Sequence, residues 1–150
     1  MSEKEDFIRQ FREVQPKFSR FYARILTQAD LSLPQFAFLS LLANLGTVSM
    51  TEAGAKLHIS KPAVTHLADR LEENQLLKRI AHPRDRRVSL LQIQPKGVKM
   101  VRKMQSQVLS FLLKTLDQLN ASERKVITHF YALLSQTIDE AILQPLRRKK

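Results

Sequence analysis

Residues 60–94 constrain the fold more than any other part of the chain. The first half of this segment, SKPAVTHLADRLEE, carries apolar residues at the i, i+3, i+4 and i+7 spacing of one helix face: Val64, Leu67, Ala68 and Leu71. Ser60 is a favourable N-cap, and the proline that follows suits the first turn, where amides have no partner inside the helix. The pattern predicts a helix that begins after Ser60 and buries one side.

A second helix is predicted immediately before this one. Ser49 and Glu52 have the spacing of a capping box, which opens a short helix that ends near Leu57. His58 and Ile59 then form a tight connection to Ser60. Two short helices joined by so few residues form a helix-turn-helix.

Two strand-like runs follow the second helix. Residues 77–81 and 88–93 are of strand length and rich in branched side chains, and the turn between them, HPRDRR, contains a proline and three arginines. A basic hairpin tip beside a helix that reads a DNA groove can enter the neighbouring minor groove, where the potential favours guanidinium groups. We therefore expect a two-stranded basic wing.

The second face of the predicted helix is polar and basic, as a helix that contacts DNA requires. The positive end of the helix dipole and the free amides of its first turn attract phosphate, and small polar side chains can reach base edges. The alternative is an ordinary surface helix with solvated charges. The candidates for DNA contact in this helix and in the wing are Ser60, Lys61, Pro62, Thr65, His66, Arg70, Arg84, Arg86 and Arg87.

Charge and composition support an anionic partner. The 150 residues carry a net charge of +11, with a pI near 10.4, and the basic residues concentrate in the segment described above. Three glycines and 43% hydrophobic residues indicate a mostly helical domain. The absence of cysteine excludes thiol-based sensing and disulfides. No apolar run approaches the roughly 20 residues of a membrane span, and the polar start is unlike a secretion signal, so we expect no membrane partner and a cytoplasmic protein.

Residues 51–97 resemble the winged helix-turn-helix of the MarR (multiple antibiotic resistance regulator) family of bacterial transcription regulators. The resemblance rests on SKPAVTHLADRLE, HPRDRR and PKG. It implies that Asp85 orients the wing arginines rather than contacting DNA. Where that family usually has glycine this chain has Gln75, so we expect Asn74 to supply the left-handed residue. Gln94 stands where the family favours threonine, which weakens a helix cap.

The remaining segments predict long helices. Aromatic and aliphatic residues recur at helical intervals over residues 7–25, and Pro16 should kink or divide this first helix. Ser32 with Gln35 caps a second helix that ends at Gly46. A helix from Pro95 to about Leu119 follows the wing, and a last helix, capped by Asn120 with Glu123, comes after it. The predicted caps are thus Ser32, Ser49, Ser60 and Asn120.

These long helices have more apolar surface than a small winged domain can cover. Pairing of two copies of the chain is the simplest way to bury this apolar surface. The alternative is a monomer with a self-contained helical core. We expect one unit over residues 1–150, with a winged DNA-binding lobe at 32–94 and dimerisation helices at 1–30 and 95–146. A symmetric dimer places two reading helices in successive major grooves of an inverted repeat, about 34 to 36 Å apart.

The resemblance also implies regulation by a small aromatic or phenolic anion bound between the helical base and the winged lobe. The candidates for such an effector pocket are Arg12, Phe18, Tyr22 and Phe36. The alternative is that these aromatic residues belong to the core. We expect a dimeric repressor that binds double-stranded DNA and is released by the effector.

Two other functions remain open at this point. The first is a DNA-binding regulator or architectural protein that responds to no effector, and the second is a basic helical interaction module that binds acidic proteins or RNA. The four histidines are scattered over a turn, two helices and the wing, without a nucleophile or a ligand spacing. We therefore expect no catalytic site, no metal site and no cofactor.

Overall fold

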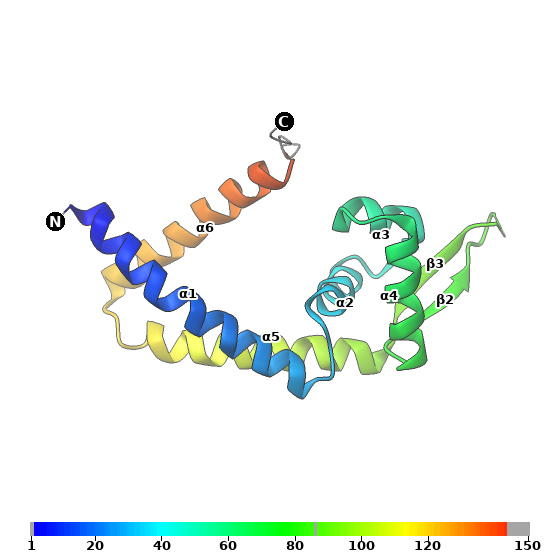
Figure 1. The fold of residues 1–150 in the computed structure, drawn as a ribbon, viewed down its shortest axis with the longest axis horizontal. Helices are drawn as coiled ribbons and strands as arrows, with labels where there is room; N and C mark the ends of the chain where they lie inside the picture. The colour runs from blue at the N-terminus through cyan, green and yellow to red at the C-terminus, as the bar shows by residue number, and fades with distance from the viewer. Residues whose placement is uncertain (1, 86, 144–150) are drawn as a thin grey trace. The chain divides into compact units, whose positions relative to one another are not determined.

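The computed structural model describes residues 2–85 and 87–143, and its elements are labelled in Figure 1. Arg86, one of the candidate DNA contacts, and residues 144–146 of the predicted dimerisation region lie outside the described residues. Contacts divide the chain into two compact units, Met1–Val108 and Leu109–Lys150. The elements in chain order are α1 (Glu3–Gln28), α2 (Leu33–Leu45), β1 (Thr47–Ser49), α3 (Met50–Leu57), α4 (Lys61–Glu73), β2 (Leu77–Ala81), β3 (Ser89–Ile93), α5 (Pro95–Leu116) and α6 (Ala121–Leu143).

Helices α2, α3 and α4 begin after the serines that were predicted to cap them. The Ser32 hydroxyl accepts a hydrogen bond from the Gln35 amide (3.3 Å), and the Gln35 side chain returns one from the Ser32 amide (2.7 Å). Ser49 caps α3 and Ser60 caps α4 in the same way, since the hydroxyl oxygen of each serine accepts a hydrogen bond from the backbone amide three residues later. Gly46 ends α2 with a φ of 79°, as predicted. Short-range side-chain to backbone hydrogen bonds therefore set these boundaries.

Pro16 does not divide α1, which is one helix from Glu3 to Gln28. Proline has no amide hydrogen, so the helix lacks the hydrogen bond that residue 16 would donate to the carbonyl of Arg12. The other predicted long helix, α5, ends at Leu116, three residues before the expected end.

The three strands form one antiparallel sheet in the order β1, β3, β2. The β2 and β3 strands are the predicted wing, and they pair from Leu77 with Ile93 to Ala81 with Ser89. The third strand, β1, was not predicted; it pairs Val48 with Leu91. A run of three residues is too short to show alternation, and its place in the sheet depends on a partner more than 40 residues away in the chain.

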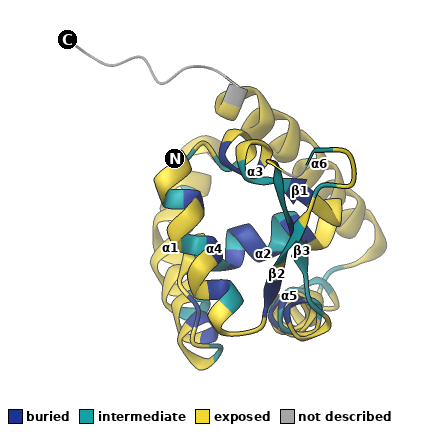
Figure 2. Cartoon of the chain, turned by 90° about the vertical axis from the view of Figure 1, so that its right-hand side faces the viewer, coloured by how far each residue is buried: buried dark blue, intermediate teal, exposed yellow. Residues whose placement is uncertain are grey.

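The core of the first unit surrounds α2. Figure 2 shows buried residues on α2, on the inner side of α4 and on the strands, whereas α6 is exposed along its described length. Phe38, Leu39 and Leu42 are fully buried, and Val64, Leu71 and Leu91 pack in the same cluster. In the described residues no single helix has the length and hydropathy of a membrane span; α1 and α2 together do, as a pair bent by 77°.

The chain reverses after α4 through Gln75, and the expectation for Asn74 was wrong. Asn74 has a φ of −85°, and its side-chain amide donates to the Arg70 carbonyl (2.9 Å). Gln75 has the left-handed φ of 58°. The Gln75 amide donates to Glu72 (2.9 Å) and the Leu76 amide to Leu71 (2.9 Å), the two hydrogen bonds of a Schellman motif. This motif requires the left-handed residue at position 75, whichever side chain stands there.

The second unit contains the end of α5 and all of α6. The Asn120 carboxamide oxygen accepts from the Glu123 amide (3.0 Å), and the Glu123 carboxylate accepts from the Asn120 amide (2.8 Å). A cavity of about 490 Å³ lies between the two helices and is mostly apolar, with Leu112, Ile127 and Tyr131 in its wall. Large apolar side chains of α6, among them Val126 (65% exposed), face solvent.

Candidate nucleic-acid interface

The packing of α4 determines which of its residues face solvent. Val64, Ala68 and Leu71 lie on one side and are fully buried. The connection from α3 is close, because a Cβ added at Gly54 would lie 3.1 Å from the Ile59 carbonyl oxygen and 3.2 Å from Val64. The buried side and the close connection to α3 fix the orientation of α4, so its opposite face is directed toward solvent.

All the predicted contacts on α4 lie on this outward face. Ser60 and the hydroxyl of Thr65 already make hydrogen bonds inside the helix: Ser60 accepts from the Ala63 amide (3.4 Å), and Thr65 donates to the Lys61 carbonyl (3.1 Å). Thr65 keeps the acceptor capacity of its oxygen, and Ser60 keeps its donor. The exposed residues of the set are Ser60, Lys61, Pro62, Thr65, His66 and Arg70.

Arg79 does not belong with the free basic residues, although the sequence places it in the basic segment. Its guanidinium binds the carboxylates of Asp69 (2.6 Å) and Glu72, and its backbone amide donates to Glu72 (2.9 Å). Burial by itself lowers the pKa of Arg79, but the hydrogen bonds to Asp69 and Glu72 outweigh it, so the pKa is raised above its ordinary value. Arg79 thus links β2, the first strand of the wing, to α4.

The wing tip is organised by two side chains, His82 and Asp85. His82 accepts hydrogen bonds at Nδ1 from the amides of Arg84 and Asp85 (both 3.2 Å). The Asp85 carboxylate accepts from the amide (3.0 Å) and the Nε (3.2 Å) of Arg87, and both bonds lower the pKa of Asp85. His82 was not among the predicted site residues, since a histidine before a turn carries no sequence signal of this contact.

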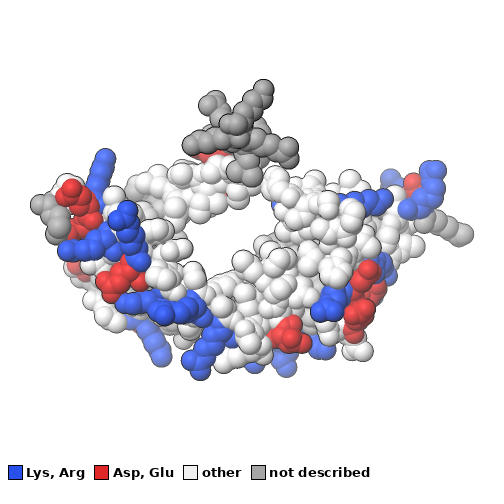
Figure 3. Space-filling view, in the orientation of Figure 1, with Lys and Arg blue, Asp and Glu red and all other residues white. Residues whose placement is uncertain are grey.

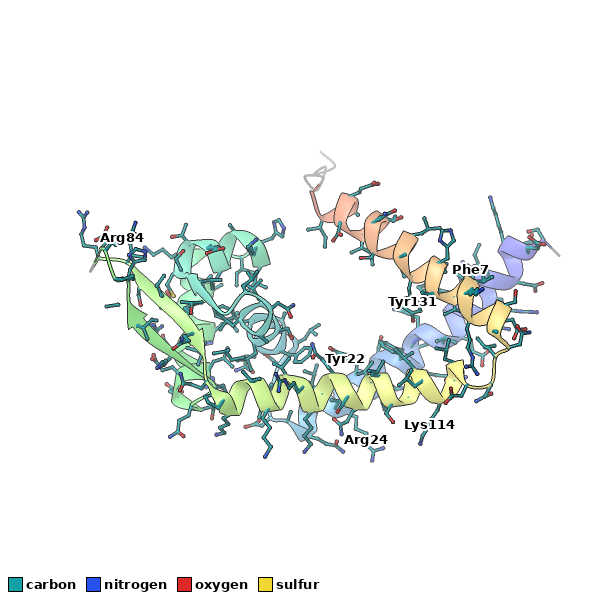
Figure 4. All side chains as sticks on the ribbon, turned by 180° about the vertical axis from the view of Figure 1, so that it is seen from behind. Phe7, Tyr22, Arg24, Arg84, Lys114 and Tyr131 are labelled. Carbon is teal, nitrogen blue, oxygen red and sulfur yellow. The ribbon has the colours of Figure 1, made fainter. Side chains whose placement is uncertain are left out.

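The wing arginines project into solvent. Figure 4 shows Arg84 at the end of the wing, pointing away from the sheet, and the Arg87 side chain is 92% exposed. In Figure 3, lysine and arginine side chains gather at this end of the winged unit. The exposed polar face lies on α4 and the exposed arginines lie on the wing, and Arg79 joins these two parts through its ion pairs with Asp69 and Glu72.

The structure brings together three of the four residues expected around an effector. The Phe18 and Tyr22 rings stack at 6.1 Å between centroids, and Tyr22 meets Phe36 edge-on at 6.0 Å. Figure 4 shows Tyr22 extending from α1 toward the winged part of the same unit. Burial raises the pKa of Tyr22. Arg12 lies on the same helix six residues before Phe18, roughly 9 Å along the axis.

Residues 31–89 match the family model described as the MarR family. The uncharacterized HTH-type transcriptional regulator YsmB of Bacillus subtilis is 32% identical over 80 residues, which are 53% of this chain and 55% of the relative. The chain therefore aligns with only about half of YsmB. A second uncharacterized regulator of the same organism, YfiV, is 28% identical over 80% of this chain and 82% of its own length.

Solved structures share the fold over a larger part of the chain. A MarR family protein from Bacillus stearothermophilus superposes with a TM-score of 0.76 at 23% identity, covering 93% of this chain and 99% of the other. A variant of Staphylococcus aureus MepR bound to an oligodeoxyribonucleotide superposes with a TM-score of 0.70 at 19% identity, covering 88% and 97%. At these identities the likeness concerns the fold.

Proposed function

We propose that this chain is a transcription regulator of the MarR family that binds double-stranded DNA, on the grounds of its family match, its relatives and the geometry of its site. The observation that carries the proposal is the coupling of two exposed polar surfaces by Arg79. One surface is the outward face of α4, and the other is the wing tip with its arginines. A helix of this kind fits the major groove, and a basic hairpin beside it fits the minor groove.

The contacts divide into two kinds. We assign Ser60, Lys61 and Thr65 to phosphates, because they lie at the start of α4, where the helix dipole is positive. Pro62, Thr65, His66 and Arg70 point outward farther along the helix, within reach of base edges or thymine methyl groups. In the wing we assign Arg84, Arg86 and Arg87 to the minor groove and the backbone, with Asp85 holding Arg87 in place.

We further propose that two copies pair through the helices outside the winged lobe. The lobe comprises residues 32–94, and the pairing regions are residues 1–30 and 95–146. Large apolar side chains remain exposed on α1 and α6, including Phe11 (59%), Val126 (65%) and Tyr131 (54%). A monomeric protein rarely exposes so many large apolar groups on neighbouring turns, so a second copy is the occupant we assign to them.

A paired molecule suits an inverted-repeat operator, and we propose that this protein is a repressor. Two reading helices must then fit successive major grooves at once. A ligand that binds better to one separation of the lobes than to the other changes operator affinity. The contact of Phe18, Tyr22 and Phe36 supplies an aromatic surface for such an effector, and Arg12 on the same helix supplies a cation.

One experiment tests the central proposal. Fragments selected by the full-length protein from random double-stranded DNA should converge on one sequence with twofold symmetry, and sedimentation of the free protein should give twice the monomer mass. A selection that never outcompetes genomic DNA contradicts sequence-specific binding, and monomer mass contradicts pairing. Binding that persists unchanged across a panel of aromatic acids supports the effector-independent regulator instead.

The basic protein-interaction module is the second candidate. Its charge would act on acidic proteins without needing the geometry of the wing. Exchange of Arg84 and Arg87 for alanine should weaken duplex DNA binding and leave the affinity for an acidic protein little changed. A duplex DNA affinity that is equally little changed would favour the interaction module, because the wing would then take no part in binding DNA.

A further inference from the structure

The tip of the wing depends on one imidazole nitrogen. The amides of Arg84 and Asp85 both donate to Nδ1 of His82, each at 3.2 Å. The amide of Arg87 donates to the Asp85 carboxylate (3.0 Å), and the amide of Val88 donates to the Asp85 carbonyl (3.0 Å). Of these four amides between β2 and β3, two therefore have a single side-chain atom as their acceptor.

His82 occupies the place that asparagine or aspartate takes in many turns. Nδ1 of histidine is bonded to Cγ, as the side-chain oxygen of asparagine is, so it can accept from amides two and three residues later in the chain. Histidine differs in one respect. A neutral imidazole has one acceptor nitrogen and an imidazolium has none, and histidine is the side chain whose charge ordinarily changes between about pH 5 and 8. The acceptor of this turn therefore exists only while the imidazole is neutral.

The charged groups of the tip act on the imidazole in opposite directions. The Asp85 carboxylate interacts with His82 and favours a positive charge on it, but Arg87 already binds this carboxylate through its amide (3.0 Å) and its Nε (3.2 Å). The guanidinium groups of Arg84 and Arg87 disfavour a positive charge. Solvent screens these interactions, whereas the contacts at Nδ1 are direct hydrogen bonds. The two bonds at Nδ1 therefore respond to the proton more directly than the neighbouring charges do.

The strand that ends before His82, β2, packs against β3 and α4. The β3 strand, Ser89–Ile93, carries no titratable side chain. The α4 helix meets β2 through Asp69 and Glu72, and the guanidinium of Arg79 binds both carboxylates. Because these carboxylates are already paired, they offer the imidazole no free partner.

We propose that His82 is the positioning residue of the wing tip: its neutral imidazole holds the tip in the conformation described above, and its protonation releases the tip. A proton on Nδ1 would point at the two amide hydrogens, so the imidazolium turns away and leaves both amides to water. Arg84 and Arg87 then lose the fixed backbone from which they project. The consequence for DNA, a lower affinity, rests on the proposed function; the release of the tip does not.

NMR titration of the full-length protein from about pH 8 to about pH 5 tests the release. The amide resonances of Arg84 and Asp85 should move with the same midpoint as the imidazole of His82, and the protection of both amides from hydrogen exchange should fall. Asp85 stays ionised over this range, because its pKa is lowered from 3.8. Amide resonances that stay in place while the imidazole of His82 titrates overturn the proposal.

Two substitutions separate the acceptor from the charge. His82→Asn keeps an acceptor at the same place at every pH, so both amides should stay protected throughout the titration. His82→Ala removes the acceptor, so both amides should lose protection already at the upper end of the range. The control, His129→Asn on α6, removes a histidine from the other compact unit and should leave the wild-type response unchanged. A wild-type response in His82→Asn, or undiminished protection in His82→Ala, overturns the proposal.

Duplex binding measures the consequence for function. At about 0.3 M salt, the charge gained by an imidazolium contributes little to affinity. Under this condition the wild-type protein should lose about fivefold more affinity for its selected duplex over the titration than His82→Asn does, because both proteins keep His58 and His66. Equal losses overturn the role of His82 in DNA binding. Failure to bind any duplex at either pH contradicts the proposed function and leaves the NMR results unaffected.

Discussion

The guanidinium of Arg79, on β2, binds the carboxylate of Asp69, on α4, with 2.6 Å between Nη2 and Oδ1. The same arginine binds Glu72 one turn farther along α4 through both its side chain and its backbone amide. The side chain of Arg79 is 28% exposed, so solvent screens these bonds less than it screens an ion pair on an open surface. The orientation of the wing relative to α4 is thus fixed by polar bonds as well as by the sheet.

Exchange of Arg79 for glutamine should lower the free energy of unfolding by about 1 kcal/mol, because it removes two charged hydrogen bonds from partly exposed carboxylates. It should also weaken binding to a selected duplex by more than the loss of one charge explains. Urea denaturation and duplex titration at several salt concentrations measure the two effects. Lys78→Gln, an exposed neighbour with the same change in charge, is the control. Equal effects of both substitutions would show that Arg79 acts only by its charge.

Exchange of Gln75 for glycine should stabilise the protein by about 1 kcal/mol. Gln75 has a φ of 58°, a conformation that costs a residue with a side chain about 1 to 2 kcal/mol and costs glycine little. Thermal unfolding followed by circular dichroism measures the change. Asn74→Gly is the control, because Asn74 has a negative φ and loses its hydrogen bond to Arg70, so that substitution should destabilise. Stabilisation by Asn74→Gly would contradict the assignment of the left-handed conformation to Gln75, because the strained residue would then be Asn74.

Exchange of Gly97 for alanine should destabilise the protein by roughly 2 kcal/mol, the cost typical of overpacking. A methyl group at Gly97 would overlap the backbone carbonyl of Leu76 and approach Ile93 to 2.9 Å. Backbone cannot move aside as a flexible side chain can. Gln105→Ala, at an exposed site on the same helix, should change the free energy of unfolding little. A neutral Gly97→Ala would mean that α5 and the wing are not packed as described.

The carboxyl group of Asp85 should titrate below its ordinary pKa of 3.8, because the amide and then the side chain of Arg87 donate hydrogen bonds to it. Since the folded-state pKa is lowered, the ordering of the wing tip by Asp85 is complete above about pH 3.8 and is lost as the pH falls through the lowered value. Carboxyl ¹³C NMR measures the titration. Arg87→Gln should raise the pKa part of the way, and Arg84→Gln, which removes no bond to this carboxylate, should change it less. An Asp85 pKa at or above its ordinary value would contradict the contact.

Exchange of His66 for alanine should weaken binding to the selected duplex by about 1 to 3 kcal/mol and relax the sequence preference at one position. Exchange of Lys61 for alanine should instead weaken binding to all duplexes and reduce the salt slope by about one unit. Titration of a selected and a scrambled duplex over a range of salt concentrations separates the two. His129→Ala, on α6, is the control for loss of a histidine. Loss of specificity from Lys61→Ala alone would reverse the two assignments.

The sequence determined the elements that depend on nearby residues. The caps at Ser32, Ser49 and Ser60 join residues three apart, and the apolar face of α4 follows from the helical period, so both are visible without a structure. The two wing strands and the exposed face of α4 follow from the same kind of local pattern. The bounds of the helix and strands that carry the candidate site could therefore be predicted almost to the residue.

Tertiary structure decided what depends on distant partners. The pairing of Val48 with Leu91, the bonds of Arg79 to α4 and the donation from Lys96 to Asn74 each join residues far apart in the chain. No period or spacing encodes these contacts, because they form only when the core around α2 brings the elements together. The left-handed residue was misplaced by one position for a related reason: hydrogen-bond geometry selects the position, and the side chains of Asn74 and Gln75 only adjust its cost.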